Sequence, residues 1–157
     1  MQNSREVIIF AELFDGRLHS GVPELCSLAR GLADQLSGVA SAILIGTDVK
    51  GLASELISYG MDKVYAADDA RLHNYQPEAY TAVIEQVCRS ENPEVLLFGQ
   101  TLRGRDLGPR LAFRLKTGIA TDCVEFTIDS VSKKLVVTRP AYGAKALATL
   151  TFLSQPA

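Results

Sequence analysis

Four mainly apolar runs, each followed by a segment with helical spacing of apolar residues, constrain the fold of this chain most strongly. The runs span Val7–Ala11, Val39–Ile45, Lys63–Ala67 and Val95–Phe98. Short continuous apolar runs are typical of strands that are covered on both faces. Strands that alternate with helices form a parallel sheet through right-handed crossovers. The pattern therefore predicts an α/β fold.

The helical segments carry recognisable start signals. Pro23 fits the first position of a helix after the first strand, and Asp48 is expected to cap the second helix. Pro77 begins the third. Asp106 is expected to cap the fourth, which spans about Asp106 to Lys116, because Pro109 is tolerated only near a helix start.

After the fourth helix, the alternation gives way to strand-like segments without helices. These lie at about Ile119–Thr121, Cys123–Ile128, Leu135–Arg139 and Leu147–Leu153. We expect a single α/β domain over residues 1–157. Its core is predicted to be an open five-stranded parallel sheet in the order 3-2-1-4-5, extended by the tail strands.

Composition narrows the classes of partner. A net charge of −2 gives no general reason to expect binding to nucleic acid or to an anionic membrane. No apolar run approaches the roughly 20 residues that span a bilayer. The segment Met1–Glu6 leads directly into the first strand, so we expect no signal peptide. Three separated cysteines, Cys26, Cys88 and Cys123, favour a reducing compartment, which we take to be the cytoplasm. Cys26 and Cys88 are predicted to lie in the core.

The familiar catalytic patterns are missing from the sequence. It has no Gly-x-Ser-x-Gly, His-Glu-x-x-His, Cys-x-x-Cys or Walker pattern, and no Gly-x-Gly-x-x-Gly after the first strand. The two histidines, His19 and His73, fall in predicted loops and are expected to be solvated. The sequence therefore predicts neither an enzyme nor a metal site.

Two polar loops remain as candidates for function. They are Glu12–Arg17, after the first strand, and Gln100–Asp106, after the fourth. If those strands are neighbours where the winding direction reverses, the loops line one crevice. Arg103 and Arg105, at a helix N-terminus, are weak candidates for holding an anionic cofactor group. The alternative for Arg105 is a pair with a carboxylate.

Three motif patches resemble the alpha subunit of electron transfer flavoprotein, and the resemblance covers essentially the whole chain. The first patch is Phe98-Gly99-Gln100-Thr101 followed by Gly104-Arg105-Asp106-Leu107-x-Pro109-Arg110-x-Ala112. The second is Thr117-Gly118 followed by Thr121-Asp122-Cys123. The third is Thr138-Arg139-Pro140-Ala141-Tyr142-Gly143 followed by Ala148-Thr149-Leu150.

Two loops depart from the family pattern. Ala144-Lys145 replaces the usual Gly-Asn, and Leu102-Arg103 replaces the frequent Ser-Leu. Contacts that other members make through these two loops are therefore not carried over to this chain.

The resemblance implies a fold of the adenine-nucleotide hydrolase-like, universal-stress-like class. It also implies a supporting role. This amino-terminal domain would pack against a beta subunit, and FAD would be held by a carboxy-terminal domain of the parent protein, so none is expected on this chain. The full protein would carry electrons from dehydrogenases, such as acyl-CoA dehydrogenases in fatty acid β-oxidation, to a quinone oxidoreductase or another acceptor.

Two alternatives to the electron-transfer interpretation belong to other classes. One is a stand-alone nucleotide-binding module of the universal-stress type. It is weakened because Gly104 and Gly108 are separated by three residues and no Gly-Ser or Gly-Thr follows. The other is a small hydrolase, which is disfavoured because the sequence offers no pair of nucleophile and base.

The partner surface is predicted around the segment Arg139–Lys145. Arg139 and Tyr142 are residue types that often anchor interfaces, although Tyr142 has the alternative role of covering the end of the sheet. Arg110 and Arg114 lie one helical turn apart. They form either a solvated face or part of the same interface.

Overall fold

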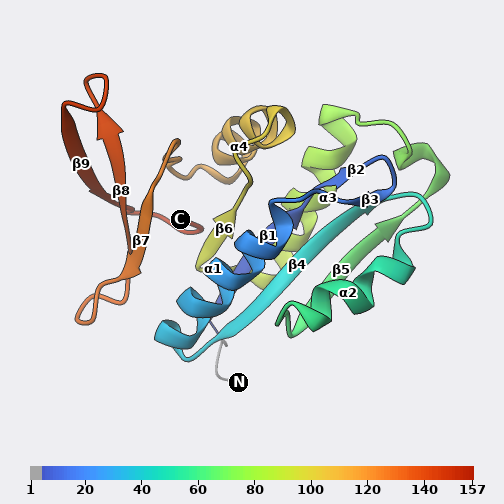
Figure 1. Ribbon diagram of the computed structural model, residues 1–157, viewed down its shortest axis with the longest axis horizontal. Helices are drawn as coiled ribbons and strands as arrows, with labels where there is room; N and C mark the ends of the chain where they lie inside the picture. Colours follow the sequence, from blue (N-terminus) through green and yellow to red (C-terminus); the bar gives the residue numbers. More distant parts are fainter. Residues whose placement is uncertain (1–4) are drawn as a thin grey trace.

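The computed structural model describes residues 5–157; Met1–Ser4, part of the segment in which we expect no signal peptide, lie outside the described residues. A four-stranded parallel sheet forms the centre of the molecule (Figure 1). Its strands are β1 (Glu6–Ala11), β4 (Val39–Gly46), β5 (Lys63–Asp68) and β6 (Val95–Leu97).

The spatial order of the parallel strands is β5-β4-β1-β6, which is 3-2-1-4 in terms of the four runs. Ile8 of β1 lies beside Ser41 of β4 on one side and Leu96 of β6 on the other. The winding direction therefore reverses between β1 and β6, as the sequence predicts. Such a reversal is where ligand crevices form in open α/β sheets.

Helices cover both faces of the parallel sheet. The helix α1 (Val22–Leu36) packs on one face together with α2 (Ala53–Ser58), and α3 (Pro77–Glu91) packs on the other with α4 (Leu102–Leu115). The remaining short elements are a two-stranded hairpin, β2 (Leu13–Phe14) with β3 (Arg17–Leu18), and the 3-10 turns η1 (Lys50–Leu52) and η2 (Ala70–Leu72). No helix in residues 5–157 is long and apolar enough to cross a membrane.

Alternate residues of β1 supply the two halves of the core. Val7 and Ile9 face the α1 layer, and Ile8 and Phe10 face the α3 and α4 layer. Each is at most 2% exposed. Complete burial of such a side chain contributes about 1.5–3 kcal/mol. This two-sided burial explains why the run is apolar at every position.

The prediction that Cys26 and Cys88 are core residues is confirmed, since both are buried. Burial raises the pKa of the Cys26 thiol to about 11 and that of Cys88 to about 12. Both side chains therefore remain neutral thiols near pH 7 and pack as small apolar groups.

The fifth parallel strand is a wrong prediction within the described residues. Ile119–Thr121 is irregular, and the tail forms a separate antiparallel sheet of β7 (Glu125–Ile128), β8 (Leu135–Ala141) and β9 (Ala146–Thr151). Tight turns join these three strands, and antiparallel pairing needs only such turns, whereas a parallel neighbour needs a long crossover. Leu135 and Val137 bury one face of this sheet in the α1 layer.

The predicted cap of α4 is also wrong. The helix begins at Leu102, and the cap is Thr101, whose hydroxyl accepts a hydrogen bond from the Gly104 N–H at 3.0 Å. Asp106 lies in the second turn, and Pro109 is inside the helix.

Asp48 does not cap the second helix either. Its N–H donates to the Asp68 carboxylate at 2.8 Å, and the same carboxylate accepts from the N–H of Val49 at 3.1 Å. A side chain from the end of β5, distant in sequence, replaces the local cap that the sequence suggests.

Candidate functional site

The loops that follow β1 and β6 meet at the carboxyl ends of these strands, as the sequence predicts. The Thr101 hydroxyl donates a hydrogen bond to the Glu12 carboxylate, which is 9% exposed. Arg103 donates to the Leu13 carbonyl at 2.7 Å and lies 3.8 Å from Glu12. The two loops are thus bound to each other across the point where the winding reverses.

A third loop closes the same crevice. The Arg103 guanidinium lies 5.3 Å from the ring centroid of Tyr75, in cation–π geometry. The Tyr75 hydroxyl donates to Asp106 at 2.6 Å. Burial raises the pKa of Tyr75, and the Asp106 carboxylate raises it further, so the phenol stays a neutral donor. Arg103 therefore has partners within the protein on several sides.

These contacts test whether the crevice fits a nucleotide or the adenosine part of a flavin. The group would lie between the β1 and β6 loops, which the Thr101–Glu12 and Arg103–Leu13 hydrogen bonds join to each other. A buried carboxylate would also face its phosphates, which is electrostatically unfavourable. The residues at this crevice do not fit such a ligand.

Arg105 lies on the other side of the α4 N-terminus. Its guanidinium is 3.7 Å from the Asp122 carboxylate, which also accepts a hydrogen bond from the Gln100 side chain. The arrangement corresponds to the carboxylate-pair alternative for Arg105. It ties the start of α4 to the segment that leads into β7.

Arg110 and Arg114 hold α4 against α3. Arg110 pairs with Asp106 at 2.8 Å and with Glu78 at 3.2 Å. Arg114 pairs with Glu78 and, at 3.2 Å, with Glu85. Both arginines remain partly exposed, so these internal pairs leave their predicted role in a partner interface open to experiment.

The hairpin of β8 and β9 projects away from the helices (Figure 1). Arg139 lies in β8, and Tyr142 begins the turn with its side chain 86% exposed. Tyr142, Gly143 and Ala144 all have positive φ. Because a left-handed backbone strains side-chain-bearing residues, this turn holds Tyr142 and Ala144 in an unfavourable conformation.

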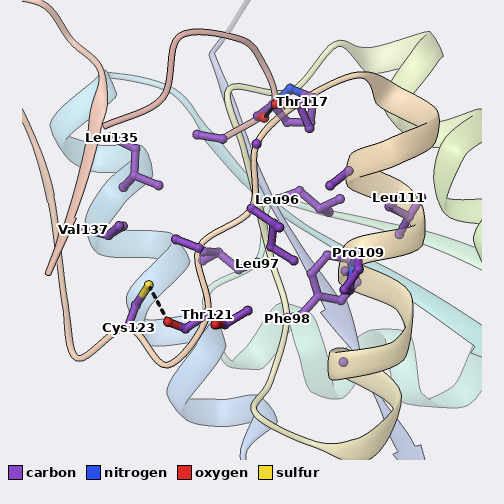
Figure 2. A pocket seen from close by; sticks show the side chains of 18 of the residues that line it. Leu96, Leu97, Phe98, Pro109, Leu111, Thr117, Thr121, Cys123, Leu135 and Val137 are labelled. Carbon is purple, nitrogen blue, oxygen red and sulfur yellow. Dashed lines mark hydrogen bonds between the residues drawn. The ribbon is translucent and has the colours of Figure 1, made fainter. Parts of the chain in front are cut away.

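A cavity of about 420 Å³ lies between β6, α4 and the tail sheet (Figure 2). Leu97 and Phe98 form its floor, Pro109 and Leu111 lie on the α4 side, and Val137 lies opposite (Figure 2). The lining is mainly apolar, with Thr117, Thr121 and the Cys123 thiol at its rim. Burial raises the pKa of Cys123, an effect that nearby Arg139 partly offsets.

Residues 5–157 contain no group of three or more side chains of the types that hold a metal ion. Of the two histidines, His19 has a structural role, because its Nδ1 accepts a hydrogen bond from the Gly21 N–H at 3.1 Å. This bond fixes the backbone just before α1.

Residues 7–157 match the electron transfer flavoprotein domain family. The chain belongs to this family. It is 46% identical over 144 residues to the electron transfer flavoprotein subunit alpha of Megasphaera elsdenii, an alignment that covers 92% of this chain and 43% of that protein. It is 41% identical over 150 residues to the subunit alpha of Thermoanaerobacterium thermosaccharolyticum, covering 96% of this chain and 45% of the relative. A third relative, 38% identical over 168 residues, is the acryloyl-CoA reductase electron transfer subunit beta of Anaerotignum propionicum. That alignment covers 93% of this chain and 46% of the relative.

The chain spans less than half the length of these curated relatives. The motifs by which this electron transfer flavoprotein domain resembles its family gather around one part of the molecule. Gly99, Gly104, Gly108, Thr117 and Asp122 all line the cavity beside β6. The hairpin motif from Thr138 onward forms the end of β8, the central strand of the tail sheet, and the turn that leads to β9.

Sequence reasoning found the two crevice loops but missed Tyr75 and Asp122 as their partners. Tyr75 is an aromatic residue in an otherwise polar loop, Asp68–Gln76, and that contrast is the available signal. Asp122 sits at positive φ in a segment expected to lie beside a strand. No local pattern connects it to Arg105, 17 positions earlier.

Proposed function

We propose that this domain is the structural amino-terminal part of an electron transfer flavoprotein alpha subunit, which packs against a beta subunit and supports the flavin-bearing part of the complex. The observation that carries the proposal is the family match over residues 7–157, with relatives named as alpha subunits covering 92–96% of the chain. The domain contributes shape and contacts rather than redox chemistry.

The surface proposed to meet the beta subunit is the end of the β8–β9 hairpin, residues 139–147. Tyr142 is 86% exposed and Leu147 is 70% exposed, so large apolar side chains face solvent close together in sequence. Arg139 lies at the base of the same segment. Exposed apolar groups beside an arginine are typical of interface anchors.

FAD is proposed to belong to the longer parent protein and not to this chain. The proposal is supported by the crevice at β1 and β6, the usual nucleotide position in this fold class, where hydrogen bonds of Thr101 with Glu12 and of Arg103 with Leu13 join the two loops. This geometry also gives no support to the universal-stress type of nucleotide module.

Within the complete protein, we propose that electrons pass from soluble dehydrogenases of acyl-CoA thioesters to a separate acceptor. The relative named as an electron transfer subunit of acryloyl-CoA reductase supports this class of partner. The cytoplasm is the proposed location, in keeping with three separated cysteines, of which two are buried thiols.

The test of the interface is co-expression with a beta subunit from a matching operon. Tyr142→Ala and Arg139→Ala are expected to weaken the complex roughly tenfold each, as interface anchors do. Phe14→Ala removes another exposed aromatic side chain, which is 64% exposed in the β2–β3 hairpin, and serves as the control.

Dissociation constants and melting temperatures of all three variants decide the question. Full binding by both hairpin variants would place the interface elsewhere, with Arg110 and Arg114 the next residues to substitute. Lower melting temperatures with unchanged binding of the folded fraction would mean that Tyr142 only covers the sheet.

A further inference from the structure

The outer edge of β9 pairs with no other strand in the described part of the chain, because β9 is the last strand in the order β7-β8-β9. Five of its six residues are exposed, and the run Ala-Leu-Ala-Thr-Leu-Thr contains no charged residue, proline or glycine. A sheet edge of this kind carries a row of backbone N–H and C=O groups that can pair with another strand. The edge of β9 is therefore a surface of main-chain donors and acceptors.

The opposite margin of the tail sheet, β7, does not offer the same surface. It carries the charged residue Glu125, and the Ile128 N–H donates a hydrogen bond to the side-chain oxygen of Gln35 in α1 at 3.2 Å. A charge and cover from a helix are two ways in which natural sheets protect an edge. Within residues 5–157, no helix side chain makes such a bond to β9, so β9 is the margin that is open to pairing.

The register of the tail sheet decides which way the side chains of β9 point. Val137, which is buried in the α1 layer, pairs with Leu150. Because neighbouring residues of a strand point to opposite faces, Leu147, Thr149 and Thr151 point to the outer face of the sheet. Leu147 is 70% exposed and Leu150 is 39% exposed, so β9 presents apolar surface on both faces beside its open edge. A strand placed next to β9 would cover both leucines.

A second copy of β9 satisfies the geometry of such a pairing. Two identical strands that pair antiparallel are related by a two-fold axis normal to the sheet, so outward residues lie opposite outward residues. The pairing can be centred on Thr149, which then faces its own copy, or on Ala148, which places the two Thr149 side chains on a diagonal. Within β9, both registers bring only neutral residues together.

Lys145, the residue just before β9, favours the antiparallel arrangement. In a parallel pair in register, the two Lys145 side chains would lie side by side, and like charges directly opposite each other destabilise strand pairing. In the antiparallel pair they lie at opposite ends of the interface, roughly 20 Å or more apart. That separation exceeds the Debye length of about 8 Å at physiological salt, so the two charges are screened from each other.

We propose that two copies of this chain associate through β9, antiparallel and about a two-fold axis, to form one six-stranded sheet. The occupant of the edge is a second copy because β9 is neutral at every position that would face its own copy, and because the two Lys145 side chains are kept apart. The dimer goes beyond the proposed function and does not depend on it.

The test is sedimentation equilibrium of the 157-residue chain over a dilution series up to roughly 1 mM, the weak end of specific association. The expected result is a reversible increase from the 17.0 kDa monomer to twice that mass, with no larger species. A two-fold contact closes on itself, whereas a contact between two different surfaces extends to longer oligomers or rings. A chain that stays monomeric throughout, or that grows beyond the dimer, would overturn the proposal.

Charge substitutions at Thr149 identify the contact. Thr149→Asp and Thr149→Lys each place two like charges opposite or diagonal to each other across the axis, and each is expected to weaken the dimer about fivefold or more. Thr127→Asp is the matched control, because Thr127 is also an exposed threonine of the tail sheet but lies on β7. It should leave the dimer unchanged. Melting temperatures show whether each variant is folded.

An equal mixture of Thr149→Asp and Thr149→Lys is the decisive arm. Opposite charges then meet across the axis, so the mixed pair should form at least as tightly as the original dimer. Weakened dimers of both variants, with recovery in the mixture, support pairing of β9 with its own copy. Unchanged dimers of both Thr149 variants, weak association that the mixture does not restore, or an equal effect of Thr127→Asp would overturn the assigned contact.

Discussion

Thr101 is the residue on which the crevice and the start of α4 both depend. Its hydroxyl accepts from the Gly104 N–H as the helix cap and donates to the carboxylate of Glu12. One side chain thereby fixes a helix end and joins two loops that are 89 positions apart in sequence.

Thr101→Ala is expected to lower the free energy of unfolding by about 1–2 kcal/mol, because caps alone contribute about 1 kcal/mol and a buried carboxylate would lose a donor. Urea denaturation measures the change. Thr101→Ser keeps the hydroxyl and is the control, expected within about 0.5 kcal/mol of the original chain. Equal losses in both variants would assign the effect to the methyl group.

Asp62 gives the stability of the chain a dependence on pH. Its carboxylate accepts from the Ala40 N–H at 2.9 Å and from Arg30 at 2.7 Å, and these hydrogen bonds, that of Ala40 first, lower its pKa. A carboxyl whose pKa is lower in the folded state stabilises above its ordinary pKa, about 3.9, and loses that contribution as the pH falls.

Asp62→Asn is therefore expected to be less stable than the original chain at pH 7 and to approach it below pH 3. Denaturant titrations at several pH values follow the difference. A difference of the same size at pH 7 and pH 3 would contradict the assigned role of the charge.

At the scale of elements, α4 lies unusually close to the end of β6. An added Cβ at Gly104 would lie 2.1 Å from the Gly99 carbonyl oxygen, a backbone atom that cannot move independently. Glycine is required at position 104, because any side chain there would force α4 further from the sheet.

Gly104→Ala is expected to cost on the order of 3 kcal/mol or more, in the range of strained core substitutions. Gly31→Ala is the matched control, because Gly31 also lies inside a helix but an added Cβ there meets nothing within 4 Å. That substitution should instead stabilise the protein by about 0.5–1 kcal/mol. Thermal melts that rank the two variants in the opposite order would refute the close-approach argument.

The limits of prediction from sequence are visible at this same scale. The strands β1 and β4 are predictable because they are buried on both faces, and α1 is predictable because it has a continuous apolar stripe. The cap of α4 was not, because Thr101 and Asp106 are both good capping residues and only the position of Glu12 in space favours the former. In the tail, the predicted strands agree with the observed ones over 125–128, 135–139 and 147–151, but their separate sheet depends on packing against α1, which local patterns do not contain.

The candidate site divides in the same way. The meeting of the β1 and β6 loops follows from the sheet topology that the sequence predicts. The closing contact of Arg103 with Tyr75 needs the path of the η2–α3 loop, and no pattern in the sequence encodes that path.

At the scale of the whole molecule, the proposal that this domain is structural and that FAD binds elsewhere in the parent protein predicts that the purified chain is colourless. The reason is the set of hydrogen bonds that join the β1 and β6 loops across the crevice, together with the proposed location of FAD in the rest of the parent protein. After desalting, the visible spectrum should lack flavin absorption, both for the chain alone and after incubation with FAD. Stoichiometric flavin that survives desalting would contradict this, and FAD bound only after Thr101→Ala would identify the crevice as the controlling contact.

The β9 strand closes one side of the tail sheet in the described part of the chain, and its six residues, Ala-Leu-Ala-Thr-Leu-Thr, include neither a charge nor a proline. Natural sheets usually protect such margins with those very residues, because an unprotected margin recruits further strands. The solubility of this protein at high concentration therefore depends on how much of the β9 edge is covered. In a cell, copies of the protein made in excess of the partner that covers the β9 edge would therefore be the ones to precipitate or to be degraded.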